Sequence, residues 1–386
     1  MRPHRFARVL LTMTLTVEAP AAVVLALSLA RAGVPFAPLV ALAIVVVVNV
    51  PLGLLISEGL TDRPTSSVRI HLVELPYFTV WSACFAFFFA APLAWIVSVF
   101  AQRPTLPTLQ WTFVGAFALA VYGVYVRRTS VRVRNVDLSV PGLPTSLDGY
   151  RIVQLSDLHV GTFAPPARVA RWVARANALR PDLVALTGDL ISSGSAFLEA
   201  AAATLGALRA TDGVAFSPGN HDYFCDHERF FSLLAAQGIW VLRSEGREVR
   251  RGESTLWIAG ADDYWKRLAD VERAMHGRPE GATTILLAHD PRLWAPAKEQ
   301  RVTLTLSGHT HGGQVAIPFL PAVNLARPAF AHTTGTHRDR DAWLVVSNGL
   351  GTTGPPARLG ASPEIVVITL RQGASRSPSR RPRRQR

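Results

Sequence analysis

The sequence predicts an α/β fold for most of the chain, preceded by an α-helical membrane domain of about four spans. Two features of the 386 residues predict this arrangement. The first third holds long apolar runs, and a helix that crosses a bilayer needs about 20 apolar residues. The remainder alternates short apolar runs with amphipathic stretches, which is typical of helices packed on β-sheets.

The apolar runs delimit a transmembrane helical domain at residues 1–127. Three runs carry no charged residue, namely 34–56, 75–101 and 108–126. A weaker run, 9–30, is interrupted by Glu18 and Pro20, and its basic start makes a signal peptide the alternative. We favour a first membrane span because three more follow. A buried core is a poor alternative, because it would leave this region without a surface.

Two acidic residues lie in or beside these runs. Glu18 and Glu74 could mark a polar pathway through the membrane domain, because ionisable groups at that depth are costly. The interpretation we favour is a helix-end or interfacial position, especially for Glu74, which starts its run.

Three further parts follow the membrane domain. A connector (128–149) leads to a soluble domain (150–371), and residues 372–386 form an arginine-rich tail that should be disordered. The formal net charge of the whole chain is +13. In a chain with membrane spans, anionic membrane lipids are the expected partner of this charge, and we expect no nucleic acid.

The soluble domain shows strand and helix periodicities in turn. The predicted strands are 152–155, 183–186, 214–217, 239–242, 255–259, 284–288, 302–306, 343–347 and 364–370, and the predicted helices are 168–179 and 197–208. In the first helix Val169, Trp172 and Val173 share one face. Fewer helices separate the strands after residue 240, so a second sheet is possible.

Polar residues follow the predicted strands at the points where these strands end. Asp157 and His159 follow the first strand, Asp189 the second, and Asn220, His221 and Asp222 the third. His289, His309 and His311 follow two later strands. In open α/β sheets this edge binds ligands. Nitrogen and oxygen ligands of these types suit first-row transition metals.

These blocks resemble the motifs of the calcineurin-like metallophosphoesterase superfamily. The blocks are Asp157-Leu158-His159, Gly188-Asp189, Gly219-Asn220-His221-Asp222, His289 and Gly308-His309-Thr310-His311. Each block is weak by itself, but the five in this order are very specific. The resemblance covers about residues 150–370 and implies a four-layer α/β/β/α sandwich.

The resemblance also implies a role for each residue. Two divalent transition-metal ions (Mn, Fe or Zn) would be bound, and Asp189 would bridge them. One ion would be held by Asp157, His159 and His311, and the other by Asn220, His289 and His309. His221 would stabilise the phosphoryl charge and protonate the leaving oxygen, and Asp222 would orient His221.

Other polar and aromatic residues have two interpretations. Tyr264 and Trp265 could line a substrate cleft, although we favour aromatic packing for them. Arg358 could bind a phosphate or form a structural pair with Glu364.

The sequence is most similar to the membrane-associated branch of the superfamily, which includes enzymes that hydrolyse UDP-2,3-diacylglucosamine in lipid A synthesis. We therefore expect a membrane-anchored enzyme that hydrolyses a phosphodiester or pyrophosphate bond, with a lipid-linked molecule as the candidate substrate. A tethered phosphodiesterase of soluble nucleotides is the alternative. A sensor or transport protein that only binds is a third hypothesis, which a missing ligand would have supported.

The arginine distribution predicts the side of the membrane. With the amino terminus inside, nine arginines would lie on inner segments (Arg2, Arg5, Arg8, Arg63, Arg69, Arg127, Arg128, Arg132 and Arg134) and two on outer loops (Arg31 and Arg103). Because cytoplasmic segments carry the excess of basic residues, we expect an inner (plasma) membrane protein of the bacterial type with a cytoplasmic catalytic domain.

Overall fold

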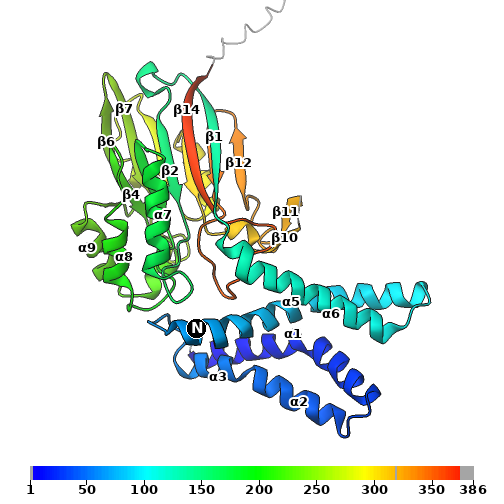
Figure 1. Cartoon of the computed structure of the whole chain (residues 1–386). Helices are drawn as coiled ribbons and strands as arrows, with labels where there is room; N and C mark the ends of the chain where they lie inside the picture. Colours follow the sequence, from blue (N-terminus) through cyan, green and yellow to red (C-terminus); the bar gives the residue numbers. More distant parts are fainter. Residues whose placement is uncertain (1–2, 318–319, 374–386) are drawn as a thin grey trace, which may run out of the picture. The chain divides into compact units, whose positions relative to one another are not determined.

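The computed structural model describes residues 3–317 and 320–373. The chain forms two compact units (Figure 1). The helical unit contains the described residues up to Ser130 together with Thr352–Leu359. The second unit contains Val131–Gly351 and the described residues from Gly360 onward. Of the tail that we expected to be disordered (372–386), Gln372 and Gly373 end a β-strand, and residues 374–386 lie outside the described residues.

The helical unit contains four helical stretches that are long and apolar enough to cross a membrane. They are Ala7–Arg31, Ala37–Ser57, Ser67–Phe100 and Thr105–Thr129. Their elements are α1 (Pro3–Arg31), α2 (Ala37–Val48), α3 (Val50–Ser57), α4 (Ser67–Arg69), a π-helical turn η1 (Ile70–Glu74), α5 (Leu75–Phe100), α6 (Thr105–Val121), a second π-helical turn η2 (Tyr122–Val126) and η3 (Arg127–Thr129). The four apolar helices predicted from the sequence are confirmed.

Proline affects these helices differently according to its position. Pro20 lies inside α1 without ending it. Asn49 separates α2 from α3. Pro51 lies in the first turn of α3, where a residue without a backbone N–H is tolerated because that N–H would have no partner within the helix. Glu18 lies in the middle of α1 and is only 4% exposed, so the helix-end or interfacial position that we favoured is wrong for this residue.

The second unit is built on two six-stranded sheets. The first sheet has the order β1 (Arg132–Pro141), β14 (Glu364–Gly373), β2 (Arg151–Leu155), β3 (Leu183–Thr187), β4 (Gly213–Ser217) and β5 (Trp240–Val241). The second has the order β12 (Gly335–Asp339), β13 (Ala342–Val346), β9 (Leu304–Ser307), β8 (Thr283–Leu287), β7 (Ser254–Gly260) and β6 (Glu245–Arg251). A small hairpin of β10 (Ala316–Ile317) and β11 (Leu320–Asn324) accompanies them.

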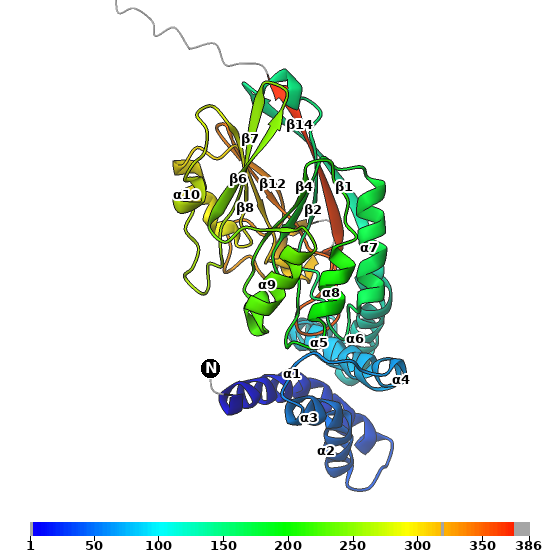
Figure 2. The ribbon, with the colours of Figure 1, turned by 90° about the vertical axis from the view of Figure 1, so that its left-hand side faces the viewer.

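Helices cover the outer faces of both sheets, as Figure 2 shows. The first sheet carries α7 (Pro166–Ala178), α8 (Leu198–Leu205) and α9 (His227–Ala236), and the second carries α10 (Trp294–Glu299). Successive residues of a strand point to opposite faces. In β2, Val153 therefore packs in the core beneath the helices, while Ile152 packs in the core between the sheets. A third core includes Leu286 and Ala297 and lies outside the second sheet. The expected four-layer α/β/β/α sandwich is confirmed.

The region expected to be a connector (128–149) contains a strand. β1 pairs in parallel with β14 along its whole length, from Arg132 opposite Glu364 to Pro141 opposite Gly373. Glu364 is completely buried and accepts hydrogen bonds from Arg132 and Arg134 at 2.8–3.1 Å. Residues 132–141 of this region therefore belong to the first sheet.

Arg358 lies in the helical unit and is fully buried. Its backbone N–H donates to the carbonyl oxygen of Gly123 at 3.2 Å. This position gives no support to the phosphate-binding interpretation, and the carboxylate of Glu364 is bound by Arg132 and Arg134.

Candidate metal centre

Loops after five strands bring the predicted ligands together. Three of these strands (β2, β3 and β4) belong to the first sheet and two (β8 and β9) to the second. Asp157 and His159 follow β2, Asp189 follows β3, and Asn220 follows β4. His289 follows β8, while His309 and His311 follow β9. Because the sheets pack face to face, side chains far apart in the sequence meet at one edge of the sandwich.

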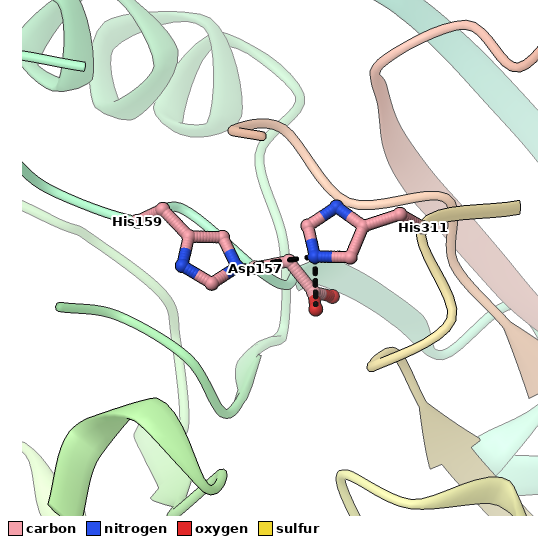
Figure 3. Close-up of side chains that lie close together, drawn as sticks. All are labelled: Asp157, His159 and His311. Carbon is pink, nitrogen blue, oxygen red and sulfur yellow. Dashed lines mark hydrogen bonds and ion pairs between the residues drawn. The ribbon is translucent and has the colours of Figure 1, made fainter. Parts of the chain in front are cut away.

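The first group of ligands consists of Asp157, His159 and His311 (Figure 3). Nε2 of His311 lies 3.1 Å from Nε2 of His159 and 3.3 Å from Oδ1 of Asp157. All three side chains are buried. Ring nitrogens and a carboxylate oxygen converge here on one point, which is the arrangement that a transition-metal ion requires.

The second group consists of Asp189, His289 and His309. Nε2 of His289 lies 3.2 Å from Oδ2 of Asp189 and 3.2 Å from Nδ1 of His309. Nδ1 of His289 donates to the carbonyl oxygen of Thr187 at 2.7 Å, which fixes the ring and points Nε2 into the group. Oδ1 of Asn220 is buried and has no hydrogen-bond partner among the described residues.

The carboxylate of Asp189 lies between the two groups. Its Oδ2 is 3.2 Å from Nε2 of His289 in the second group and 3.7 Å from Nε2 of His159 in the first. Its Oδ1 accepts the backbone N–H of His221 at 2.8 Å. One carboxylate thus faces histidines of both groups and is held in place by the backbone.

The backbone beneath the ligands is strained. Five of the seven predicted ligands have positive φ angles, namely Asp157 (51°), His159 (47°), Asp189 (53°), His309 (68°) and His311 (53°). Non-glycine residues rarely adopt this region, and such strain gathers at functional sites. Position 308 requires glycine, because a Cβ there would collide with Oγ of Ser156 and Oδ2 of Asp157.

The electrostatic field of the site favours positive charge. Burial opposes ionisation of both His289 and Asp189, but their mutual attraction outweighs it. The pKa of His289 rises to about 10, and the pKa of Asp189 falls well below its usual range. Burial, with the nearby charge of His289, lowers the pKa of His309 to about 4, which keeps that ring neutral and able to coordinate. The two groups of nitrogen and carboxylate donors, with the unpartnered Oδ1 of Asn220 beside them, fit a pair of cations.

His221 stands beside the first group without being part of it. Its ring centroid is 4.6 Å from that of His159, and its Nδ1 lies 2.7 Å from the carbonyl oxygen of Ser192. A further combination of possible ligands joins His221 with His159 and Asp189, so geometry also allows a coordinating role. The side chain is only partly buried, and substrate can therefore reach it.

Asp222 makes contacts different from the one that we expected. Its carboxylate is completely buried and accepts the backbone N–H groups of Asp189, Leu190, Ile191 and Gly219 at 2.8–3.2 Å. Burial and the charge of Asp189 raise the pKa of Asp222 to about 7, against the pull of these N–H donors. Asp222 holds the turn that carries Asp189, while the ring of His221 is oriented by Ser192.

Arg292 and Phe330 lie beside the second group and were not predicted from the sequence. The guanidinium of Arg292 lies over the rings of Tyr264, Trp265 and Phe330, with its carbon 4.2–4.9 Å from their centroids. Nε1 of Trp265 lies 3.1 Å from Nε2 of His309. Tyr264 is 40% and Trp265 56% exposed, and both rings pack against Arg292. No motif in the sequence marks Arg292, because its aromatic neighbours come from distant segments.

Comparisons with known proteins agree with this site. The family model described as calcineurin-like phosphoesterase matches residues 150–313. The chain is 38% identical to a transmembrane protein with metallophosphoesterase domain from Danio rerio, over 66% of this chain and 60% of that protein. It is 33% identical to the protein of the same description from Bos taurus, over 70% of this chain and 63% of that protein. It is 31% identical to an uncharacterised metallophosphoesterase, YkuE, from Bacillus subtilis, over 59% of this chain and 82% of that protein.

Proposed function

Because the chain belongs to the calcineurin-like metallophosphoesterases, we propose that its site holds two divalent transition-metal ions and hydrolyses a phosphodiester or pyrophosphate bond. The observation that carries the proposal is the position of Asp189, whose carboxylate faces His159 of one ligand group and His289 of the other. Two ions that share a carboxylate can stabilise both the attacking and the leaving oxygen of an in-line displacement.

Each residue has a distinct task in the proposed reaction. Asp157, His159 and His311 would hold one ion, while Asn220, His289 and His309 would hold the other. His221 approaches substrate from the side of the first group, where it stabilises negative charge on the phosphoryl oxygens and donates a proton to the leaving oxygen. Ser192 and Asp222 are positioning residues, since they act through His221 and Asp189.

We propose a lipid-linked substrate, similar in chemistry to UDP-2,3-diacylglucosamine. The four helices of membrane-spanning length support this, because they would keep the enzyme in the bilayer that holds such a substrate. The chain spans 60% of the length of the Danio rerio relative and 63% of the Bos taurus relative, and both of these are described as transmembrane proteins.

A soluble nucleotide is the second candidate, and the exposed indole of Trp265 beside His309 supports it. An aromatic face at this position could stack on a base, as base–aromatic contacts stabilise nucleic-acid binding elsewhere. The two candidate substrates can be distinguished by whether the rate of hydrolysis depends on acyl chains in the substrate.

Turnover assays on the purified full-length protein test these proposals. We expect hydrolysis of a synthetic phosphodiester to stop when a chelator removes the metals and to return when Mn, Fe or Zn is added. We expect a diacylated nucleotide-sugar in mixed micelles to be hydrolysed faster than its deacylated counterpart. Equal rates would exclude the lipid-linked substrate in favour of the nucleotide, and no hydrolysis of any phosphoester with any metal would contradict the enzyme itself.

We further propose that the protein resides in an inner (plasma) membrane with the catalytic unit in the cytoplasm. The support is the count of nine arginines on the predicted inner segments against two on the outer loops. A cytoplasmic location would also place the basic tail near anionic headgroups of the inner leaflet.

A further inference from the structure

A cavity of about 480 Å³ lies inside the helical unit. It is lined from α1, α2, α5 and α6 almost entirely by apolar side chains, such as Leu25, Val45, Val80 and Phe113. Its volume falls within the range of about 300–1,000 Å³ that is usual for small-molecule sites, which are also mostly apolar with a few polar groups.

One ionisable group stands in this apolar lining. Glu18 is 4% exposed, and its Oε2 accepts a hydrogen bond from Nδ2 of Asn49 at 2.6 Å. Its Oε1 is buried and has no partner among the described residues. Oδ1 of Asn49 is also buried and has no hydrogen-bond partner among the described residues. The two hydrogen bonds of this side chain are both donated by its amide nitrogen. Buried acceptors without donors are costly, so this place in the fold calls for a hydrogen-bond donor.

The cavity is elongated along α1. Ser28 and Gln110, which are joined by a hydrogen bond of 2.8 Å, also line it. Ten residues of helix separate Glu18 from Ser28, which corresponds to about 15 Å along the axis. A cavity with this extent and lining matches a hydrocarbon chain better than a compact polar molecule.

The depth of Glu18 limits the head group of such a ligand. Glu18 lies near the middle of the membrane-length stretch Ala7–Arg31. A phosphate or ammonium group would have to cross much of the hydrocarbon layer to reach it, at a high cost in hydration. A neutral hydroxyl can make that passage and can still donate a hydrogen bond.

We propose that this cavity binds a lipid alcohol from the bilayer. The hydroxyl group donates to Oε1 of Glu18, and the hydrocarbon chain lies against the apolar residues of α1, α2, α5 and α6. The site is separate from phosphoester hydrolysis and needs neither the metal ligands nor a bound ion.

Photo-crosslinking of the purified full-length protein tests the proposal. The protein is prepared in a detergent that has no O–H or N–H donor and is labelled with hexadecanol that carries a diazirine in its chain. Mass spectrometry should locate the label on the lining segments of α1, α2, α5 and α6. Unlabelled hexadecanol should compete at about one tenth of the concentration that its methyl ether needs, since one buried hydrogen bond is lost with the ether.

Matched substitutions on α1 make the test specific. Ala22→Phe fills the cavity and should reduce labelling at least several-fold, whereas Ala19→Phe, at an exposed position one residue from Glu18, should leave it unchanged. Glu18→Leu should retain labelling and remove the preference for alcohol over ether. Equal competition by alcohol and ether in the unsubstituted protein would overturn the proposal without any variant, as would undiminished labelling of folded Ala22→Phe.

Discussion

His221 differs from His289 in what the second nitrogen of its ring meets. Its Nδ1 is engaged by the carbonyl oxygen of Ser192 at 2.7 Å, which leaves Nε2 for substrate. His289 is fixed in the same way by Thr187, but its Nε2 faces Asp189 at 3.2 Å. Both histidines are therefore held by a backbone carbonyl at Nδ1, and their roles differ because Nε2 of His221 is left for substrate whereas Nε2 of His289 faces Asp189.

His221→Ala should keep both ions and lower kcat by roughly 10²–10⁴, the usual contribution of a general acid or base. The loss should be smaller for nitrophenyl esters than for alkyl esters, because a good leaving group needs no proton. Steady-state kinetics and metal analysis on the same preparation provide the check. Loss of an ion from the variant would instead identify His221 as a ligand.

Asp222→Asn should weaken metal binding by roughly 10–100-fold, the usual effect of changing a group that supports ligands. The carboxylate accepts four backbone N–H groups, and an amide can offer only one oxygen to them. Titration of the metal-free protein measures the affinity. Asp226→Asn is the matched control, because Asp226 caps α9 on the exposed surface. The metal affinity of this variant should equal that of the unsubstituted protein. Unaltered metal affinity in Asp222→Asn would show that Asp222 does not support the metal ligands.

At the scale of elements, the ion pairs of β1 and β14 differ in burial and should differ in energy. Glu364→Ala should lower the free energy of unfolding by roughly 1–3 kcal/mol, because it removes buried hydrogen bonds from Arg132, from Arg134 and from the backbone N–H of Asn348. Asp137→Ala breaks only the exposed pair with Arg371 and should cost under about 1 kcal/mol. Proteolysis-coupled urea titration of the full-length protein measures both values. Equal decreases in the free energy of unfolding for the two variants would show that the hydrogen bonds to Glu364 do not stabilise the pairing of β1 with β14.

Three strands at sheet edges and the small hairpin of β10 and β11 were not predicted from the sequence. β1 begins one edge of the first sheet, and β12 and β6 are the two edges of the second. The sequence of β6, EGREVRR, has a charged surface and only one aliphatic side chain. Edge strands are half exposed and discourage further pairing with charge, so they lack the apolar signal that marks central strands. The nine predicted strands were all found, with boundaries that differ from those observed by at most three residues, at the end of β14.

The sequence also predicted which side chains would meet at the metal centre, but only part of what holds them. Residues that follow neighbouring parallel strands gather at one sheet edge, which predicts that Asp157 and Asp189 lie close together, and the resemblance to the family added His289 from the second sheet. The capping of the Asp189 turn by Asp222 could not be predicted in this way. It depends on loop backbone directions, which no side-chain pattern in the sequence reports.

At the scale of the whole molecule, the arginine count predicts that a fusion placed after Leu370 remains in the cytoplasm. Alkaline phosphatase fused there should be inactive and a fluorescent protein should be bright, because the first folds only after export. The same pair of fusions after Gln102, in the predicted outer loop, should give the reverse result. An active phosphatase after Leu370 would place the catalytic unit outside and refute the proposed orientation.

The central proposal is that two ions share Asp189, and metal analysis combined with turnover tests it most directly. The purified full-length protein should contain two transition-metal ions per chain. Asp189→Asn should lose both ions together with nearly all hydrolysis of a synthetic phosphodiester, because its carboxylate faces both ligand groups. Asp157→Asn should weaken chiefly one ion. Two tightly bound ions and normal turnover in Asp189→Asn would contradict the bridging role of this carboxylate.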